Sequence, residues 1–286
     1  MTNVIIKVKI NIRGVFVFEL REKNGVKYLV IKEFEDTNLV NHCFSTRHGG
    51  VSTGEAASLN FGFTRKDSRE NVRQNFRIIC NTINTDFESI VLTDQVHDNK
   101  VYVVTKKDAG KGILKESDIK ETDALVTNEK GVTLVTFHAD CIPVFFLDPI
   151  TKSIGLAHSG WKGTYKNISA EVISKMKSEY GTNPADLMCG IGPSILKCHF
   201  EVGEDVAEMF REKYGEKHII SAENTKSAKP HIDLTGIVEE QLKNCGVKTI
   251  IQSNICTYCN KDMYYSYRGD DHKTGSLISM MALKEG

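Results

Sequence analysis

Residues 132–165, VTLVTFHADCIPVFFLDPITKSIGLAHSGWKGTY, contain three apolar runs rich in β-branched and aromatic residues. The runs lie at 132–135, 144–147 and 154–157, and such continuous runs are typical of buried central strands. A helix is predicted directly after the third run, from Gly160 to Tyr180, with Gly181 ending it. This stretch therefore predicts buried strands followed by a helix.

The same alternation continues on both sides of this stretch. Further strands are predicted at 90–92, 101–104, 124–126, 187–188, 249–251 and 277–281, and further helices at 67–84, 203–214 and 234–244. Residues 4–6, 15–18 and 28–31 predict an N-terminal β-meander, with a turn at residues 23–25. Helices that alternate with strands predict one continuous α/β domain with a mixed sheet over residues 1–286, in which residues 1–40 form a small β appendage.

Composition limits the partners of this domain. Lys and Arg total 37, as do Asp and Glu, so the 286-residue chain has no basic excess for nucleic acid or an acidic membrane. No apolar run reaches the roughly 18 residues of a membrane span, and no signal peptide is apparent. Eight sparse cysteines favour a reducing compartment. We therefore expect a soluble cytoplasmic protein with small-molecule partners.

Three residues of metal-binding types follow apolar strands. They are His97, Cys141 and His158. Loops at strand ends form the ligand crevice of α/β folds, so these residues can converge there. Two histidines and a cysteine suit zinc, and three protein ligands leave a fourth position where bound water has a pKa near about 7. Alternatively, Cys141 is a nucleophile with His97 or His158 as its base.

Three other segments are candidates for ligand binding. Arg47, followed by Gly49-Gly50, can bind an anion, or the segment is an ordinary glycine turn. Lys162 stands at the predicted helix start, where backbone N–H groups favour anions, although the glycines there also suit strand–helix packing. Cys256 and Cys259 have metal-clip or redox spacing without a second such pair, and His272 is an additional candidate ligand, so we predict a structural role or none.

Together, the motifs resemble those of the YfiH-type laccase-domain, or multicopper polyphenol oxidase, family. They comprise STRHGGVS (45–52), SLNFG (58–62), DQVH (94–97), ADC (139–141), AHSGW (157–161), GIGP (190–193) and SYR (266–268). The resemblance runs from Phe44 to Leu283 and implies a single α/β/β/α-type domain with His97, Cys141 and His158 as metal ligands. Family members are regarded as purine nucleoside phosphorylases with adenosine deaminase activity. Lys162, Gly269 and Cys259 depart from the usual family pattern.

The resemblance implies phosphorolysis of adenosine, inosine, guanosine and methylthioadenosine, plus hydrolytic deamination of adenosine. We predict zinc, with copper as the alternative, held by the His97, Cys141 and His158 set. We predict that Arg47 and Lys162 neutralise phosphate, and that Gln95, Asp140 and Arg268 position the substrate. The partners are then purine nucleosides and phosphate; no oligomeric state is predicted.

Two other functions use the same residues. One is a copper-dependent polyphenol oxidase, which is disfavoured because the nine histidines include no His-X-His pair. The other is a zinc-stabilised binding module without catalysis. A fourth protein ligand such as His48 or Cys259 would favour the binding module, because structural zinc sites are normally closed by four ligands.

Overall fold

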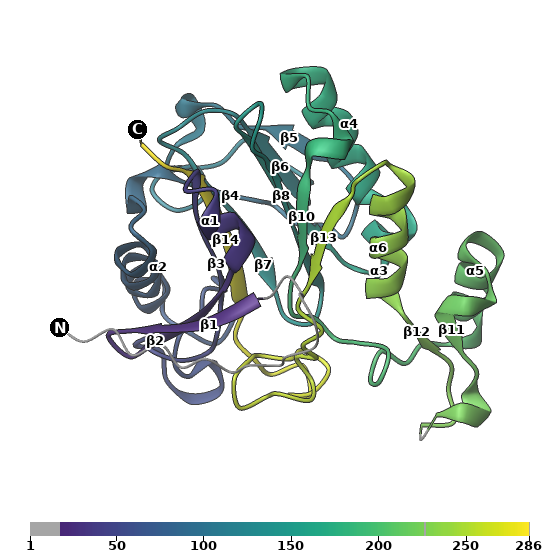
Figure 1. Ribbon diagram of the computed structural model, residues 1–286. Helices are drawn as coiled ribbons and strands as arrows, with labels where there is room; N and C mark the ends of the chain where they lie inside the picture. Colours follow the sequence, from purple (N-terminus) through teal and green to yellow (C-terminus); the bar gives the residue numbers. More distant parts are fainter. Residues whose placement is uncertain (1–17, 226, 286) are drawn as a thin grey trace.

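The computed structural model describes residues 18–225 and 227–285, in which two six-stranded sheets pack face to face (Figure 1). The first sheet has the spatial order β1 (Phe18–Lys23), β2 (Val26–Ile31), β3 (Val40–Ser45), β14 (Leu277–Leu283), β7 (Thr133–His138) and β4 (Ile90–Leu92). Only the β4–β7 pair is parallel among these described strands. Asn24 and Gly25 join β1 to β2 with positive φ, as a two-residue hairpin requires. The predicted meander is thus confirmed from Phe18 onward, while 4–6 and 15–17 lie outside the described residues.

The second sheet has the order β13 (Thr249–Gln252), β10 (Met188–Ile191), β8 (Ile142–Asp148), β9 (Ser153–Ser159), β6 (Ala124–Thr127) and β5 (Val101–Val103). Its outermost pairs, β13–β10 and β5–β6, are parallel and its inner pairs are antiparallel. A two-stranded sheet pairs β11 (Ile219–Ile220) with β12 (His231–Ile232). The predicted α/β class and mixed pairing are confirmed, and the strands divide between two large sheets, as the α/β/β/α-type domain implied by the family resemblance requires.

Helices cover the outer face of each sheet, which gives the α/β/β/α layers. The helices are α1 (Lys32–Asp36), α2 (Arg69–Ile83), α3 (Trp161–Tyr165), α4 (Ile168–Tyr180), α5 (Glu204–Tyr214) and α6 (Leu234–Asn244). Figure 1 shows α2 outside the first sheet and α4 and α6 outside the second. Strand β8 explains the layering, because Val144 and Phe146 join the core under α4 and α6, while Phe145 and Leu147 join the core between the sheets.

The helix predicted over 160–180 is interrupted. It ends as α3 at Tyr165 and restarts as α4 at Ile168, because Asn167 adopts a left-handed φ of 62°. The Asn167 side chain then caps α4 by accepting a hydrogen bond from the Ala170 N–H at 3.2 Å. The predicted helices at 67–84, 203–214 and 234–244 are confirmed as α2, α5 and α6. Within the described part of the chain, no helix has the length and apolar character to span a membrane.

Candidate metal centre

The structure brings His97, Cys141 and His158 together. His97 lies in the loop after β4, Cys141 lies between β7 and β8, and His158 lies in β9. One potential ligand atom from each residue lies within 4.8 Å of the others. His158 is buried, Cys141 is partly buried and His97 is exposed. The three residues therefore form a compact donor set that is reachable from one side.

Two ligand-bearing loops have backbone conformations that L-residues rarely adopt. His97 has φ of 63°, and Asp140, directly before Cys141, has φ of 88°. Such conformations persist where surrounding contacts hold them, and they concentrate at functional sites. Gly160 allows the approach of both loops, because a Cβ there would lie 2.7 Å from His97 Cδ2 and 3.4 Å from Cys141 Sγ.

Asp123 is a functional residue that the sequence did not reveal. Its fully buried carboxylate accepts hydrogen bonds from the backbone N–H groups of residues 96, 97 and 98, each at 3.0 Å. Asp123 Oδ1 also lies 2.7 Å from His158 Nδ1. A histidine that donates through Nδ1 presents Nε2 to a metal, so Asp123 orients His158 and holds the His97 loop. Its sequence signal is only one acidic residue before a buried strand.

The charges of the cluster favour metal binding. Burial would raise the pKa of Cys141, but His158 and His97 outweigh burial and lower it to about 6. Burial would lower the pKa of His158, but Cys141 and Asp123 raise it to about 9. At neutral pH Cys141 is therefore a thiolate, the form of cysteine that binds metals, whereas His158 has to release a proton when it binds one. The donor set therefore fits a borderline-soft cation such as zinc.

His138 lies beside the cluster but has both ring nitrogens engaged. His138 Nε2 lies 2.8 Å from Thr136 Oγ1, and Nδ1 lies 3.1 Å from the Cys141 carbonyl oxygen. Burial lowers the pKa of His138 well below its usual value, so the ring is neutral. These contacts assign His138 to support of the Cys141 backbone.

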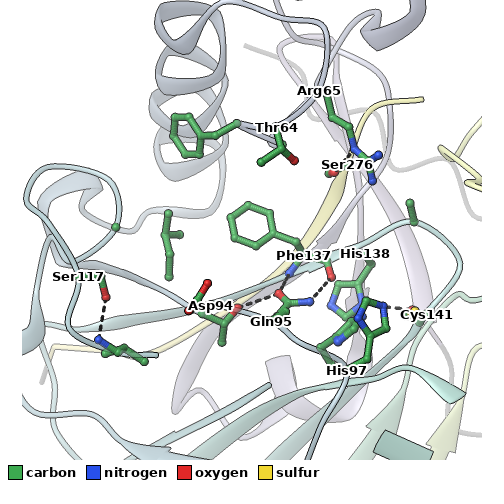
Figure 2. A pocket seen from close by; sticks show the side chains of 18 of the residues that line it. Thr64, Arg65, Asp94, Gln95, His97, Ser117, Phe137, His138, Cys141 and Ser276 are labelled. Atoms are coloured by element: carbon green, nitrogen blue, oxygen red, sulfur yellow. Dashed lines mark hydrogen bonds between the residues drawn. The ribbon is translucent and has the colours of Figure 1, made fainter. Parts of the chain in front are cut away.

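A cavity of about 720 Å³ opens onto the cluster (Figure 2). Its volume falls in the range of small-molecule sites, about 300–1,000 Å³. Phe137 and Tyr267 supply aromatic surface, and Arg65 supplies a half-buried cation on the wall. Arg65 donates from Nε to Ser276 Oγ at 3.2 Å, and Figure 2 shows the two side chains together above Phe137. Sequence reasoning missed Arg65, because the position of this loop over the cavity depends on tertiary packing.

Two of the predicted substrate-positioning residues have their polar atoms occupied. Gln95 lines the cavity, but Oε1 accepts from Phe137 N at 2.7 Å and Nε2 donates to Phe137 O at 2.9 Å. Asp140 is buried, and its carboxylate accepts from Thr257 Oγ1 at 2.6 Å and from Arg268 N at 2.7 Å. Gln95 thus fixes one cavity wall, and Asp140 fixes the turn into Cys141.

The predicted anion-binding cations lie outside the set that lines this cavity. Arg47 donates to the carbonyl oxygens of Ala57 and Lys261, at 3.3 and 2.7 Å, and so joins two loops. Lys162 is exposed on the short α3, with Nζ 5.5 Å from the Trp161 ring centre. Arg268 lines a separate cavity of about 350 Å³ and donates from Nη1 to Glu201 O at 3.1 Å.

The paired glycines after Arg47 also have other partners. The N–H groups of Gly49 and Gly50 donate to Ser58 Oγ at 3.1 and 3.3 Å, and that of Val51 donates to Asn75 Oδ1 at 2.9 Å. These backbone donors are therefore used inside the protein, which favours the glycine-turn alternative for this segment. A Cβ on Gly50 would lie 2.3 Å from the Ser58 carbonyl oxygen, so glycine serves close packing here.

The chain has an α/β/β/α fold with a cluster of two histidines and one cysteine at a cavity. This combination defines the class of protein to which it belongs, the laccase-domain class. Residues 41–284 match the family described as multi-copper polyphenol oxidoreductase laccase, and the chain belongs to this family. It is 37% identical over 264 residues to "Purine nucleoside phosphorylase YlmD" of Bacillus subtilis, covering 90% of this chain and 95% of that protein. It is 32% identical over 248 residues to "Purine nucleoside phosphorylase" of Bacteroides thetaiotaomicron, covering 84% and 90%.

The fold has the same relatives as the sequence. The crystal structure of YlmD from Geobacillus stearothermophilus superimposes with a TM-score of 0.85 at 29% identity, covering 94% of this chain and 100% of that chain. A hypothetical YfiH protein from Bacillus licheniformis gives a TM-score of 0.84 at 30% identity, covering 93% and 99%. The predicted family resemblance is confirmed.

Proposed function

We propose that this protein is a purine nucleoside phosphorylase that cleaves adenosine, inosine, guanosine and methylthioadenosine with phosphate. The observation behind this proposal is that three converging metal-binding side chains open onto a cavity of nucleoside size. Relatives named purine nucleoside phosphorylase support the substrate class. We further propose adenosine deamination at the same site, in which water replaces the purine amino group and ammonia leaves.

The side chains around the cavity would have different roles in phosphorolysis. His97, Cys141 and His158 would hold zinc, which when bound supplies a Lewis acid for an anionic or polar oxygen. Arg65 faces the same cavity and would neutralise phosphate. Phe137 and Tyr267 offer apolar surface for the purine. Phosphate oxygen forms a bond to the ribose anomeric carbon, the carbon–nitrogen bond breaks, and the purine leaves with the bonding pair and takes a proton.

The donors support the proposal of zinc over copper. The described residues contain two Cys/His groups, the candidate metal centre and a second group formed by Cys198, His199, Cys256 and Cys259. Neither group contains more than two histidines, whereas a multicopper centre consumes many imidazoles. The non-catalytic binding module has weaker support. Cys259 lies in a different cluster, and His48 Nε2 lies 2.6 Å from the Asp262 carbonyl oxygen, so neither of the proposed fourth ligands joins the first cluster.

We further propose a single catalytic domain over residues 1–286 in a reducing, cytoplasmic setting. Strands β8 and β14 each contribute to two cores, which leaves no boundary between separately packed halves of the described chain. β1 and β2 extend the first sheet through β3, which ties the described part of residues 1–40 to that domain. All eight cysteines are free, as a reducing compartment requires.

Product analysis of metal-quantified protein tests the proposed reactions. The protein is incubated with adenosine, with and without phosphate, beside Cys141→Ala and the control Cys245→Ser, which changes a partly buried cysteine outside both clusters. We expect phosphate-dependent adenine and ribose 1-phosphate, plus inosine from deamination, with both activities lost only in Cys141→Ala. An intact zinc-loaded protein without product, or an active Cys141→Ala protein with full zinc content, would contradict the proposal.

A further inference from the structure

A second group of metal-binding side chains lies outside the candidate metal centre. Cys198, His199, Cys256 and Cys259 have potential ligand atoms that all lie within 4.8 Å of one another. The group combines the CxxC pair of the sequence with a Cys-His pair from the segment after β10. His272, the additional ligand suggested by the sequence, lies instead against Tyr267, with ring centres 4.4 Å apart. We call Cys198, His199, Cys256 and Cys259 the second cluster.

The spacing of the second cluster matches tetrahedral zinc coordination. With zinc–sulfur bonds of about 2.3 Å and zinc–nitrogen bonds of about 2.0 Å, the donor atoms of a tetrahedral site stand about 3.5–3.8 Å apart. Cys198 Sγ lies 3.8 Å from Cys259 Sγ. His199 Nδ1 lies 3.2, 3.3 and 3.9 Å from the sulfurs of Cys198, Cys259 and Cys256, respectively. A disulfide would need sulfurs about 2 Å apart, so the structure favours a shared cation.

Neighbouring groups already hold the donors in position. The His199 ring stacks on Tyr258, with ring centres 4.0 Å apart and planes at 17°, which directs Nδ1 toward the sulfurs. The Leu196 N–H donates to Cys256 Sγ at 3.5 Å, a bond that suits a thiolate. Ser194 and Cys256 form an isolated parallel bridge, which aligns the two donor segments. Contacts of this kind orient the side chains that bind the metal directly in metal sites.

The second cluster is connected to the turn that presents Cys141. Thr257, between Cys256 and Cys259, donates to the Asp140 carboxylate at 2.6 Å. Ile195, on the other segment, donates from its N–H to the Asp140 carbonyl oxygen at 2.9 Å. Asp140 has the unusual φ of 88° and directly precedes Cys141. Both segments of the second cluster therefore hold the same strained turn.

We propose that Cys198, His199, Cys256 and Cys259 bind a second zinc ion in a closed, structural site that clamps residues 194–200 to residues 255–260 and so steadies the Asp140 turn. Three thiolates and one imidazole are a common donor set for structural zinc, and four protein ligands leave no position for substrate. The inference stands on these residues alone and does not depend on the proposed nucleoside activity.

Metal content of the intact protein, purified under reducing conditions, tests this site. We expect two zinc ions per wild-type chain, one in Cys259→Ser, one in Cys141→Ala and none in the double variant. Cys245→Ser is the matched control and retains two. In Cys259→Ser the thermal midpoint falls by about 5 °C or more, because a structural metal contributes to folding. One zinc per saturated wild-type chain, lost in Cys141→Ala and kept in Cys259→Ser, would overturn the proposal.

A second measurement keeps the test valid if Cys259→Ser does not fold. Alkylation of the folded wild-type protein is mapped by mass spectrometry before and after chelation. Cys198 and Cys259 are exposed, so without a metal they should react at once. We expect zinc to protect both thiols until the chelator is added. Immediate modification of zinc-saturated protein, or a Cys198–Cys259 disulfide in the reduced preparation, would contradict a zinc site.

Discussion

The two Cys/His clusters of this protein differ in the number of donors and in their surroundings. The first has three donors from three strand ends, and it faces a cavity of about 720 Å³. The second has four donors from two adjacent segments and lies outside that cavity lining. Three donors leave a position for a reactant, whereas four donors complete a tetrahedron. The comparison indicates chemistry at the first cluster and structural support at the second.

Matched histidine substitutions should separate the two clusters most strongly. In His158→Ala we expect phosphorolysis to fall about 1,000-fold, because a ligand of the reactive metal is lost. In His199→Ala we expect less than a tenfold loss of activity, with a lower thermal midpoint, because only support is lost. Steady-state kinetics, zinc content and thermal unfolding of each variant measure the contrast. Equal loss of activity in both variants would contradict different roles for the two clusters.

Asp123→Asn should weaken the first cluster without affecting the second. The carboxamide keeps the size of Asp123 but loses the charge that pairs with His158 Nδ1. We expect zinc affinity of the first site to fall about 10- to 100-fold, as for other outer partners of histidine ligands. Competition with a chelator of known affinity measures this change, and Asp36→Asn, an exposed partner of Lys32, is the control. Unchanged zinc affinity would show that Asp123 does not support zinc binding at the first cluster.

Arg65→Ala tests whether the first cluster is open to phosphate while the second cluster is closed. Arg65 is the half-buried cation on the cavity wall, and a hydrogen bond to a charged group contributes about 1.5–3 kcal/mol. We therefore expect the KM for phosphate to rise about tenfold or more with both zinc ions retained. The exposed Lys162→Ala serves as the comparison and should change this KM less than about twofold. A larger effect at Lys162 would restore the anion role predicted for it from the sequence.

The smallest of these effects is expected for Gly160→Ala. The new methyl group would lie 2.7 Å from His97 Cδ2, which is too close for a Cβ contact, so the imidazole has to shift. We expect activity to fall about fivefold, because small misplacements of reacting groups reduce rates. Zinc at the second cluster is the internal control and should remain bound. Wild-type activity would mean that the His97 loop tolerates displacement.

Prediction from sequence succeeded where the signal is local. The spacing of Val72, Phe76 and Ile79 predicted α2, because periodicity operates within one helix. Asn24-Gly25 defines the first hairpin for the same reason. The break at Asn167 was missed, because the apolar stripe continues through it and only the φ of one residue changes.

The cations predicted to bind phosphate or substrate do not line the cavity, and the reason is physical. Arg47 and Arg268 donate to backbone carbonyl oxygens of distant loops, and such contacts leave no periodic trace in the sequence. Arg65 lies on a loop whose partner, Ser276, is more than 200 residues away in the chain. Residue type identifies a charge, but loop packing decides which charge faces a cavity.

By itself, the sequence determined the α/β class, most strand and helix positions, and the residue types of the first donor set, because these depend on local periodicity and side-chain chemistry. Only the tertiary structure decided which strands pair in each of the two sheets and that Asp123 supports His97 and His158. It also joined Cys198 and His199 to the CxxC pair. Such relations depend on which distant segments pack together, and that is set by the folded core as a whole.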